Sequence, residues 1–198
     1  MRPLIFAILL SLCVEFAHSQ ALLGTTGWLN IPTAEMQEDG TFFAGGSFIN
    51  KNYIANYGDA KYNLATYYFN LTFLPFLEVN FGNMRLLDNI DNNNTVDRRF
   101  TFRFRPLRER KYIPAVVIGA HDVYTSVPKD YEYNQYFSSL YIVLTKHFDI
   151  KKSEIAATLG YGINAFRNNR YIGFFGGVSF RPGFYRPLNL IVNYDAKE

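Results

Sequence analysis

Three arginine side chains in one short segment of this chain could bind anions together. Arg99, Arg103 and Arg105 share one parity of positions, and the opposite parity of that segment is rich in phenylalanine. Because successive strand residues point to opposite faces, a strand here would carry a ladder of guanidinium groups on one face. Guanidinium suits carboxylate and phosphate, so the ladder could contact an acidic polymer. It could instead form an internal ion-pair network with Glu78 that fills a narrow lumen, or the solvent-exposed face of a soluble sandwich.

A second candidate site is a tyrosine-rich stretch in and just beyond the loop predicted over Asp122–Gln135. Tyrosine rings offer stacking surfaces, and tyrosine hydroxyls and asparagine amides offer hydrogen bonds of the kind that sugars use. The candidate sugar contacts are Tyr131, Tyr133, Asn134 and Tyr136. The same side chains could instead fold the loop over the mouth of the domain.

Signals for catalysis are weaker. His121 lies where a strand is expected to enter this loop, and Ser126, His121 and Asp122 could supply a nucleophile, a base and an orienting group. Adjacent strand residues point to opposite faces, however, so Asp122 does not simply orient His121, and a structural histidine is the favoured interpretation. His147 follows Lys146 and has no evident partner in the sequence, which indicates an interface or turn residue. We therefore expect no catalytic residue.

The elements that must position these groups are strands. Apolar and polar residues alternate along the three consecutive segments 65–73, 77–82 and 99–105, and a period of two is typical of a sheet with two unlike faces. The apolar faces are aromatic, and the opposite faces carry charge. This combination suits a sheet whose outer face meets lipid and whose inner face is wet.

The alternation also predicts how these strands pair. A short turn at Leu74–Phe76 sets Thr72 opposite Glu78, and the next hairpin sets Glu78 opposite Arg103. The apolar pairs predicted on the other face are Phe73–Leu77, Leu71–Val79, Phe69–Phe81, Phe81–Phe100, Val79–Phe102 and Leu77–Phe104. A slip of one residue would turn each set to the wrong face, so the register is strongly specified.

Nine strands are predicted after a short lead that is rich in glycine and proline. They cover Thr41–Ile49, Lys61–Leu74, Leu77–Leu86, Arg98–Leu107, Ala115–Val123, Tyr136–His147, Glu154–Tyr161, Tyr171–Phe180 and Leu188–Asp195. Short turns alternate with longer connections, as in outer-membrane barrels. The fold class expected is therefore all-β, an antiparallel up-and-down outer-membrane β-barrel. An odd strand number, and an end at Asp195–Glu198 without a terminal aromatic residue, suggest that C-terminal strands are missing or that the count is off by one.

The first residues have the pattern of a cleavable secretory signal. Arg2 precedes an apolar core over Leu4–Val14, and Ala17–Ser19 supplies a small-residue cleavage site. We expect a signal peptide over 1–19 and a single β-barrel domain over 20–198, with a lead over 20–40. The apolar core is shorter than the roughly 20 residues of a membrane-spanning helix.

The composition limits the classes of ligand that we expect this chain to bind. Beyond the signal the chain has two histidines and no cysteine, so we expect neither a metal site nor a cofactor. The net charge of +3 is small and its basic part is local, at Arg98–Arg110. That is not the broad basic face of a nucleic-acid binder, and we expect no nucleic-acid partner.

Several motifs spread over the chain resemble the YjbH family. They are Thr26–Ala34 with Asp39–Gly40, Asn70–Pro75, Val117–Asp122, Thr145–Phe148 and Phe175–Phe180. The resemblance implies an outer-membrane β-barrel of Gram-negative bacteria that is associated with exopolysaccharide or capsule production. It carries over no catalytic residue. The partners expected are outer-membrane lipid, acidic polysaccharide and other exopolysaccharide-assembly proteins.

The leading hypothesis is thus a non-catalytic outer-membrane accessory protein in exopolysaccharide assembly or export, acting as a scaffold or polymer-contacting surface. One alternative is an outer-membrane lipid-modifying enzyme that uses His121 at its rim. The other is a secreted soluble β-sandwich that binds glycans, against which the paired aromatic faces argue because they would aggregate in water.

Overall fold

A computed structural model describes residues 21–22, 24–51, 63–87, 96–121, 139–164 and 173–195. The predicted signal over 1–19 and the four candidate sugar contacts over 131–136 lie outside these ranges. No helix in the described part of the chain is long and apolar enough to cross a membrane. The strands are β1 (Gly27–Trp28), β2 (Ile31–Pro32), β3 (Phe42–Ile49), β4 (Leu64–Phe73), β5 (Leu77–Leu86), β6 (Val96–Leu107), β7 (Ala115–His121), β8 (Ser139–Ile150), β9 (Ser153–Asn164), β10 (Gly173–Arg181) and β11 (Leu190–Asp195).

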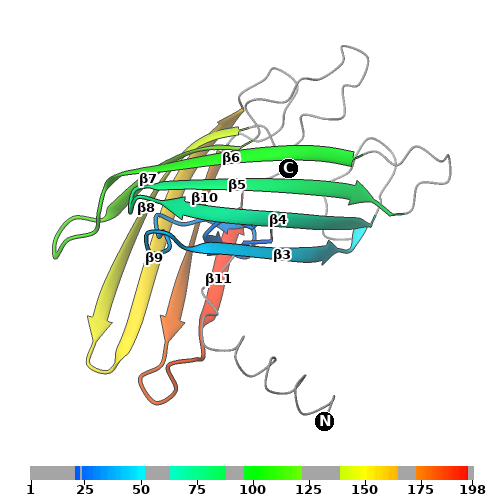
Figure 1. Ribbon diagram of the computed structural model, residues 1–198. Helices are drawn as coiled ribbons and strands as arrows, with labels where there is room; N and C mark the ends of the chain where they lie inside the picture. The colour runs from blue at the N-terminus through cyan, green and yellow to red at the C-terminus, as the bar shows by residue number, and fades with distance from the viewer. Residues whose placement is uncertain are drawn as a thin grey trace, which may run out of the picture.

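Nine of these strands form one antiparallel up-and-down sheet. Each strand from β3 to β11 pairs with its neighbours in the chain, in the spatial order β11 to β3. All nine predicted strands are present, with ends shifted by a few residues. The sheet curls strongly, so that β3–β6 run across β8–β11 in Figure 1. Among the described residues β3 and β11 are its two edges and do not pair with each other, so this sheet is not closed into a barrel.

The predicted pairing of β4, β5 and β6 is confirmed residue by residue. Phe73 pairs with Leu77 and Phe69 with Phe81 across the first hairpin. Across the second, Phe81 pairs with Phe100 and Glu78 with Arg103. The rings contact one another along this row: Phe69 and Phe81 stack with centroids 5.1 Å apart, and Phe81 and Phe100 meet edge to face with centroids 4.8 Å apart. Cross-strand aromatic pairs of this kind hold the register that the alternation predicts.

The two faces of the sheet are chemically opposite. On the inner face, which the lead covers, the buried polar side chains are Thr66, Asn70, Thr72, Glu78, Asn80, Arg99, Thr101, Arg103, His121, Ser139, Thr145, Thr158 and Ser179. On the outer face, the exposed apolar side chains include Phe69, Leu71, Phe73, Phe100, Phe102, Phe104, Ile118, Ile142, Leu144, Leu159, Tyr161, Phe174 and Val178. Large apolar side chains therefore lie on the outside of this sheet, and the polar side chains lie on the face that the lead covers.

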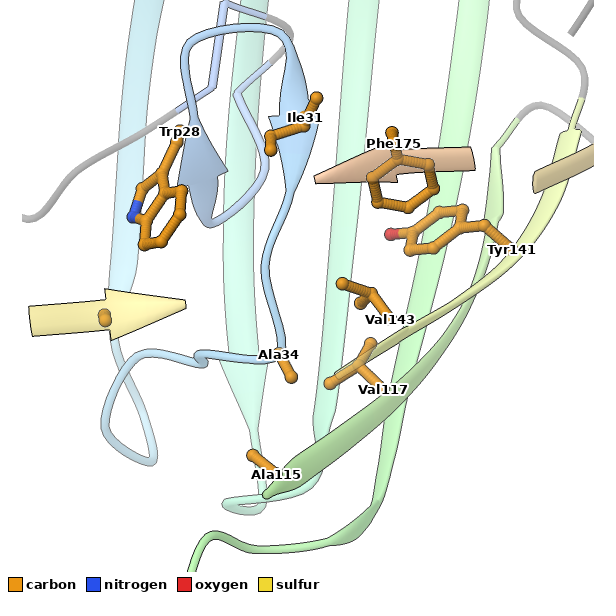
Figure 2. Packing of buried hydrophobic residues seen from close by; sticks show 9 residues of the cluster. Trp28, Ile31, Ala34, Ala115, Val117, Tyr141, Val143 and Phe175 are labelled. Carbon is orange, nitrogen blue, oxygen red and sulfur yellow. The ribbon is translucent and has the colours of Figure 1, made fainter. Parts of the chain in front are cut away.

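The lead supplies much of the core. Trp28 and Ile31, from the small β1–β2 hairpin, are 1% and 0% exposed. They pack in one cluster with residues of β7 and β8, among them Val117 and Tyr141, and Figure 2 shows Ala34 of the lead beside Val117. The sequence predicted no long regular element here, which is confirmed, but it did not predict that this segment fills the inner face.

Glycine on the inner face makes room for aromatic rings. A Cβ on Gly119 would lie 2.0 Å from Cζ of Tyr141, one strand away, and a Cβ on Gly160 would lie 2.2 Å from Cζ of Phe175. Tyr141 and Phe175 in turn pack edge to face, with ring centroids 6.2 Å apart. Both rings are almost fully buried because their neighbours have no side chain.

Candidate functional site

One buried ion pair lies at the centre of the inner face. Nη1 of Arg103 donates to Oε2 of Glu78 at 2.8 Å, and both side chains are 0% exposed. Glu78 also accepts hydrogen bonds from the lead: the backbone N–H of Thr26 reaches Oε1 at 3.0 Å, and the Thr26 hydroxyl reaches Oε2 at 2.8 Å. A buried charge pair is tolerable only with such additional hydrogen bonds.

Arg103 also holds the lead directly. Its Nη2 donates to the carbonyl oxygen of Thr33 and, at 3.1 Å, to that of Glu35. Nearby, Nδ2 of Asn80 donates to the Gly24 carbonyl at 2.9 Å. The polar residues of β5 and β6 therefore anchor the lead at several points. The contacts of Arg103 are therefore those of an internal ion-pair network that fills the space inside the sheet, which was one of the alternatives predicted from the sequence.

The three arginines of the predicted ladder have different surroundings. Arg99 is buried, and its guanidinium lies against Gly82, where an added Cβ would be 2.9 Å from Nη2. Arg105 is only half-buried at the end of β6. Its Nη2 donates to the Pro75 carbonyl at 2.5 Å, and its Nε is buried with no hydrogen-bond partner in the described part of the chain. Arg105 thus differs from Arg103 in having no carboxylate partner among the described residues.

A second charged cluster forms around His147, near the end of β8. Nδ1 lies 2.6 Å from Oε2 of Glu109, and Nε2 lies 2.8 Å from Oε1 of Glu35. Both ring nitrogens donate only in the imidazolium form, and an ionised carboxylate only accepts, so this geometry describes a cationic His147 between two anions. Nζ of Lys146 adds a contact to Oε1 of Glu109 at 2.5 Å. The interpretation of His147 as a residue without a partner of note is therefore wrong.

The two carboxyl groups of this cluster are stabilised as anions. Burial alone would raise the pKa of Glu35, but the hydrogen bond and charge of His147 outweigh burial and lower it. Burial likewise opposes ionisation of Glu109, and hydrogen bonds from Lys146 and His147 lower its pKa. The cluster joins three parts of the chain, because Glu35 belongs to the lead, Glu109 to the β6–β7 connection and His147 to β8.

This cluster borders a cavity of about 280 Å³ between the lead and the inner face. The cavity lies at the end of the sheet where the β6–β7, β8–β9 and β10–β11 connections turn. Its charged and amide-bearing lining residues are Glu35, Gln37, Arg105, Glu109, His147 and Arg181. Of these six, only Arg105 is a binding candidate predicted from the sequence.

His121 packs inside the sheet at the other end. It is 6% exposed, its Nδ1 lies 2.9 Å from the Thr101 hydroxyl, and its ring stacks on Tyr141 with centroids 4.9 Å apart. These are the contacts of a packed structural histidine. Asp122 and Ser126 lie outside the described residues. Within those residues, no group of three metal-ligating side chains is assembled.

The fold and the site together define an all-β protein whose antiparallel sheet is apolar outside and charged inside, with its own N-terminal segment packed on the charged face. Residues 19–172 match the family model described as "Exopolysaccharide biosynthesis protein YbjH", named YjbH. This match covers most of the chain, so the protein belongs to the YjbH family, as its motifs indicated. No curated protein and no solved structure matches it.

Proposed function

We propose that this protein is an outer-membrane β-barrel component of exopolysaccharide production, and that it acts without covalent catalysis as a scaffold or polymer-contacting surface. Family membership connects the chain with exopolysaccharide biosynthesis. The observation that carries the finer proposal is the outer face of the sheet. It presents rows of phenylalanine, leucine and isoleucine outward, whereas charged and amide side chains point inward.

Strand length supports a membrane setting. A membrane-spanning strand needs about 9 to 11 residues. β4 and β5 have 10 residues each, and β6, β8 and β9 have 12 each. In water, so large an apolar surface would promote aggregation, which disfavours the soluble sandwich.

The lengths of the connections between strands indicate which end of the sheet faces the periplasm. The connections β4–β5 and β8–β9 are tight turns, whereas those between β5 and β6 and between β7 and β8 are longer. Outer-membrane barrels have short turns on the periplasmic side and long loops outside. We infer that the cavity end of the sheet faces the periplasm. The free edges of β3 and β11 would require further strands, because lipid cannot satisfy exposed backbone groups.

The lead favours a scaffold or binding role over an open pore. It occupies the inner face and is held there by Glu78, Asn80 and Arg103. A polymer could not pass along that face without displacing it. In contrast, the cavity beside His147 is open to solvent at one end, since the His147 and Glu35 side chains keep 27% and 30% exposure.

Deleting the gene and complementing it tests the role in polysaccharide production. Loss of secreted polysaccharide in the deletion strain, restored by the intact chain, supports the proposal. A deletion strain with unchanged polysaccharide yield and composition contradicts it. His121→Ala tests the lipid-modifying alternative, which predicts that a folded variant loses an acyl-transfer or deacylation activity; our proposal predicts no such activity to lose.

A further inference from the structure

We infer that the cavity between the lead and the sheet is a binding site for one acidic sugar unit, whose carboxylate group pairs with Arg105. This inference rests on the proposed role in exopolysaccharide production and adds a ligand class and a place. The cavity of about 280 Å³ is close to the lower size limit of small-molecule sites, roughly 300 Å³. It therefore suits a single sugar ring better than a long stretch of polymer.

Arg105 is the group in this cavity with unused binding capacity. Among the residues that the structure describes, one of its five N–H donors meets the Pro75 carbonyl and the others meet no acceptor. Nε itself is buried, as Nε of Arg103 is, so a ligand in the cavity would meet the Nη groups of Arg105. The two Nη groups of a guanidinium form a planar fork that can meet the two oxygens of a carboxylate side by side.

The other two cationic side chains that line the cavity, His147 and Arg181, already have carboxylate partners. His147 is held by Glu35 and Glu109 at 2.8 Å and 2.6 Å, and so serves to fix these two carboxylates in place. Arg181 pairs with Glu154 at 3.3 Å, but the Arg181 side chain is 45% exposed. Exposed pairs of this kind are weak, so Arg181 can turn to an incoming anion at little cost.

The fixed carboxylates favour a sugar with a single negative charge. Each ionised carboxylate has about four acceptor positions, and His147 and Lys146 use only some of those on Glu35 and Glu109. The remaining positions can accept hydrogen bonds from sugar hydroxyls. A doubly charged phosphate would meet stronger repulsion from the same two groups, whereas a uronic acid combines one carboxylate with several hydroxyl donors.

Binding to the purified, detergent-extracted chain tests this inference, using a glucuronate-containing disaccharide as the probe. A neutral glucose disaccharide and inorganic phosphate are the comparison ligands. We expect the uronate to bind at least tenfold more tightly than either. Equal affinity for all three, no uronate binding, or tighter binding of phosphate would overturn the inference.

Two variants locate the site. Arg105→Gln removes the charge and the fork and is expected to weaken uronate binding at least tenfold. Arg108→Gln removes an equal charge from an exposed position nearby and is expected to change affinity less than twofold. Equal losses in both variants would show a general charge effect and contradict the site.

Folding of the variants is checked by heat-induced mobility on gels. If Arg105→Gln does not fold, Arg105→Lys is the second variant, because it keeps the charge but loses the planar guanidinium. It should still weaken uronate binding severalfold. Wild-type affinity in Arg105→Lys would overturn the inference. Binding is measured on isolated protein, so a failure to bind uronate would overturn this inference alone. The deletion phenotype and the membrane location test the proposed function independently.

Discussion

Arg103 and Glu78 form a fully buried ion pair, 2.8 Å from Nη1 to Oε2, through which the lead is fastened to the sheet. Removing one partner leaves a buried charge uncompensated, which typically costs about 3–5 kcal/mol. We therefore expect Arg103→Ala and Arg103→Glu to lower the free energy of unfolding by at least that amount. Urea unfolding monitored by gel mobility measures it, and an unchanged midpoint in either variant would show that the pair does not anchor the lead.

The lead should also contribute through its apolar side chains. Trp28 is 1% exposed in the core cluster, whereas its neighbour Leu29 is 51% exposed. Trp28→Ala should cost about 3–5 kcal/mol through lost burial and the cavity left behind. Leu29→Ala should cost much less, and it is the matched control. If both variants unfold at the wild-type urea concentration, the lead is not part of the folded core.

Inner-face glycines should not tolerate a side chain. The Cβ of Gly119→Ala would overlap the buried ring of Tyr141 at 2.0 Å, and overpacking of a core typically costs about 1–3 kcal/mol. Ala120→Val adds volume at the next residue, which points to the outer face, and surface changes usually stay within about 0.5 kcal/mol. Equal stability of the two variants in thermal unfolding would contradict the assignment of the faces.

Acid should loosen the cluster around His147. The pKa of Glu35 is lowered in the folded protein from an ordinary value of 4.5, so the unfolded chain binds more protons in the window below that value. The stabilisation by Glu35 is therefore complete above about pH 4.5 and is lost as pH falls through the lower, folded pKa. Unfolding measured between pH 3 and pH 7 should show this loss in wild type and a smaller one in Glu35→Gln. Parallel pH profiles for the two proteins would contradict the ionic contact.

Strand pairing could be predicted from the sequence because the information is local. Phe73, Leu77 and Phe81 alternate with polar residues on both sides of a three-residue turn, and a one-residue slip would bury the wrong set. The opposition of Glu78 and Arg103 follows from the same register, so this part of the site could be predicted too.

The cavity could not be predicted in the same way. His147 meets Glu35 and Glu109, which lie 112 and 38 residues away in the chain, and no periodic pattern relates such distant positions. Trp28 and Ile31 belong to a hairpin whose two strands have two residues each, which is too short to show a period. Their place in the core depends on how an irregular segment folds back into a curved sheet.

The most direct test of the central claim is fractionation of expressing cells, followed by gel electrophoresis of the membrane fraction with and without boiling. An outer-membrane β-barrel is expected in the outer-membrane fraction, to need detergent for extraction and to shift in mobility when boiled. Recovery in the periplasm without detergent, with the same mobility before and after boiling, would contradict the barrel.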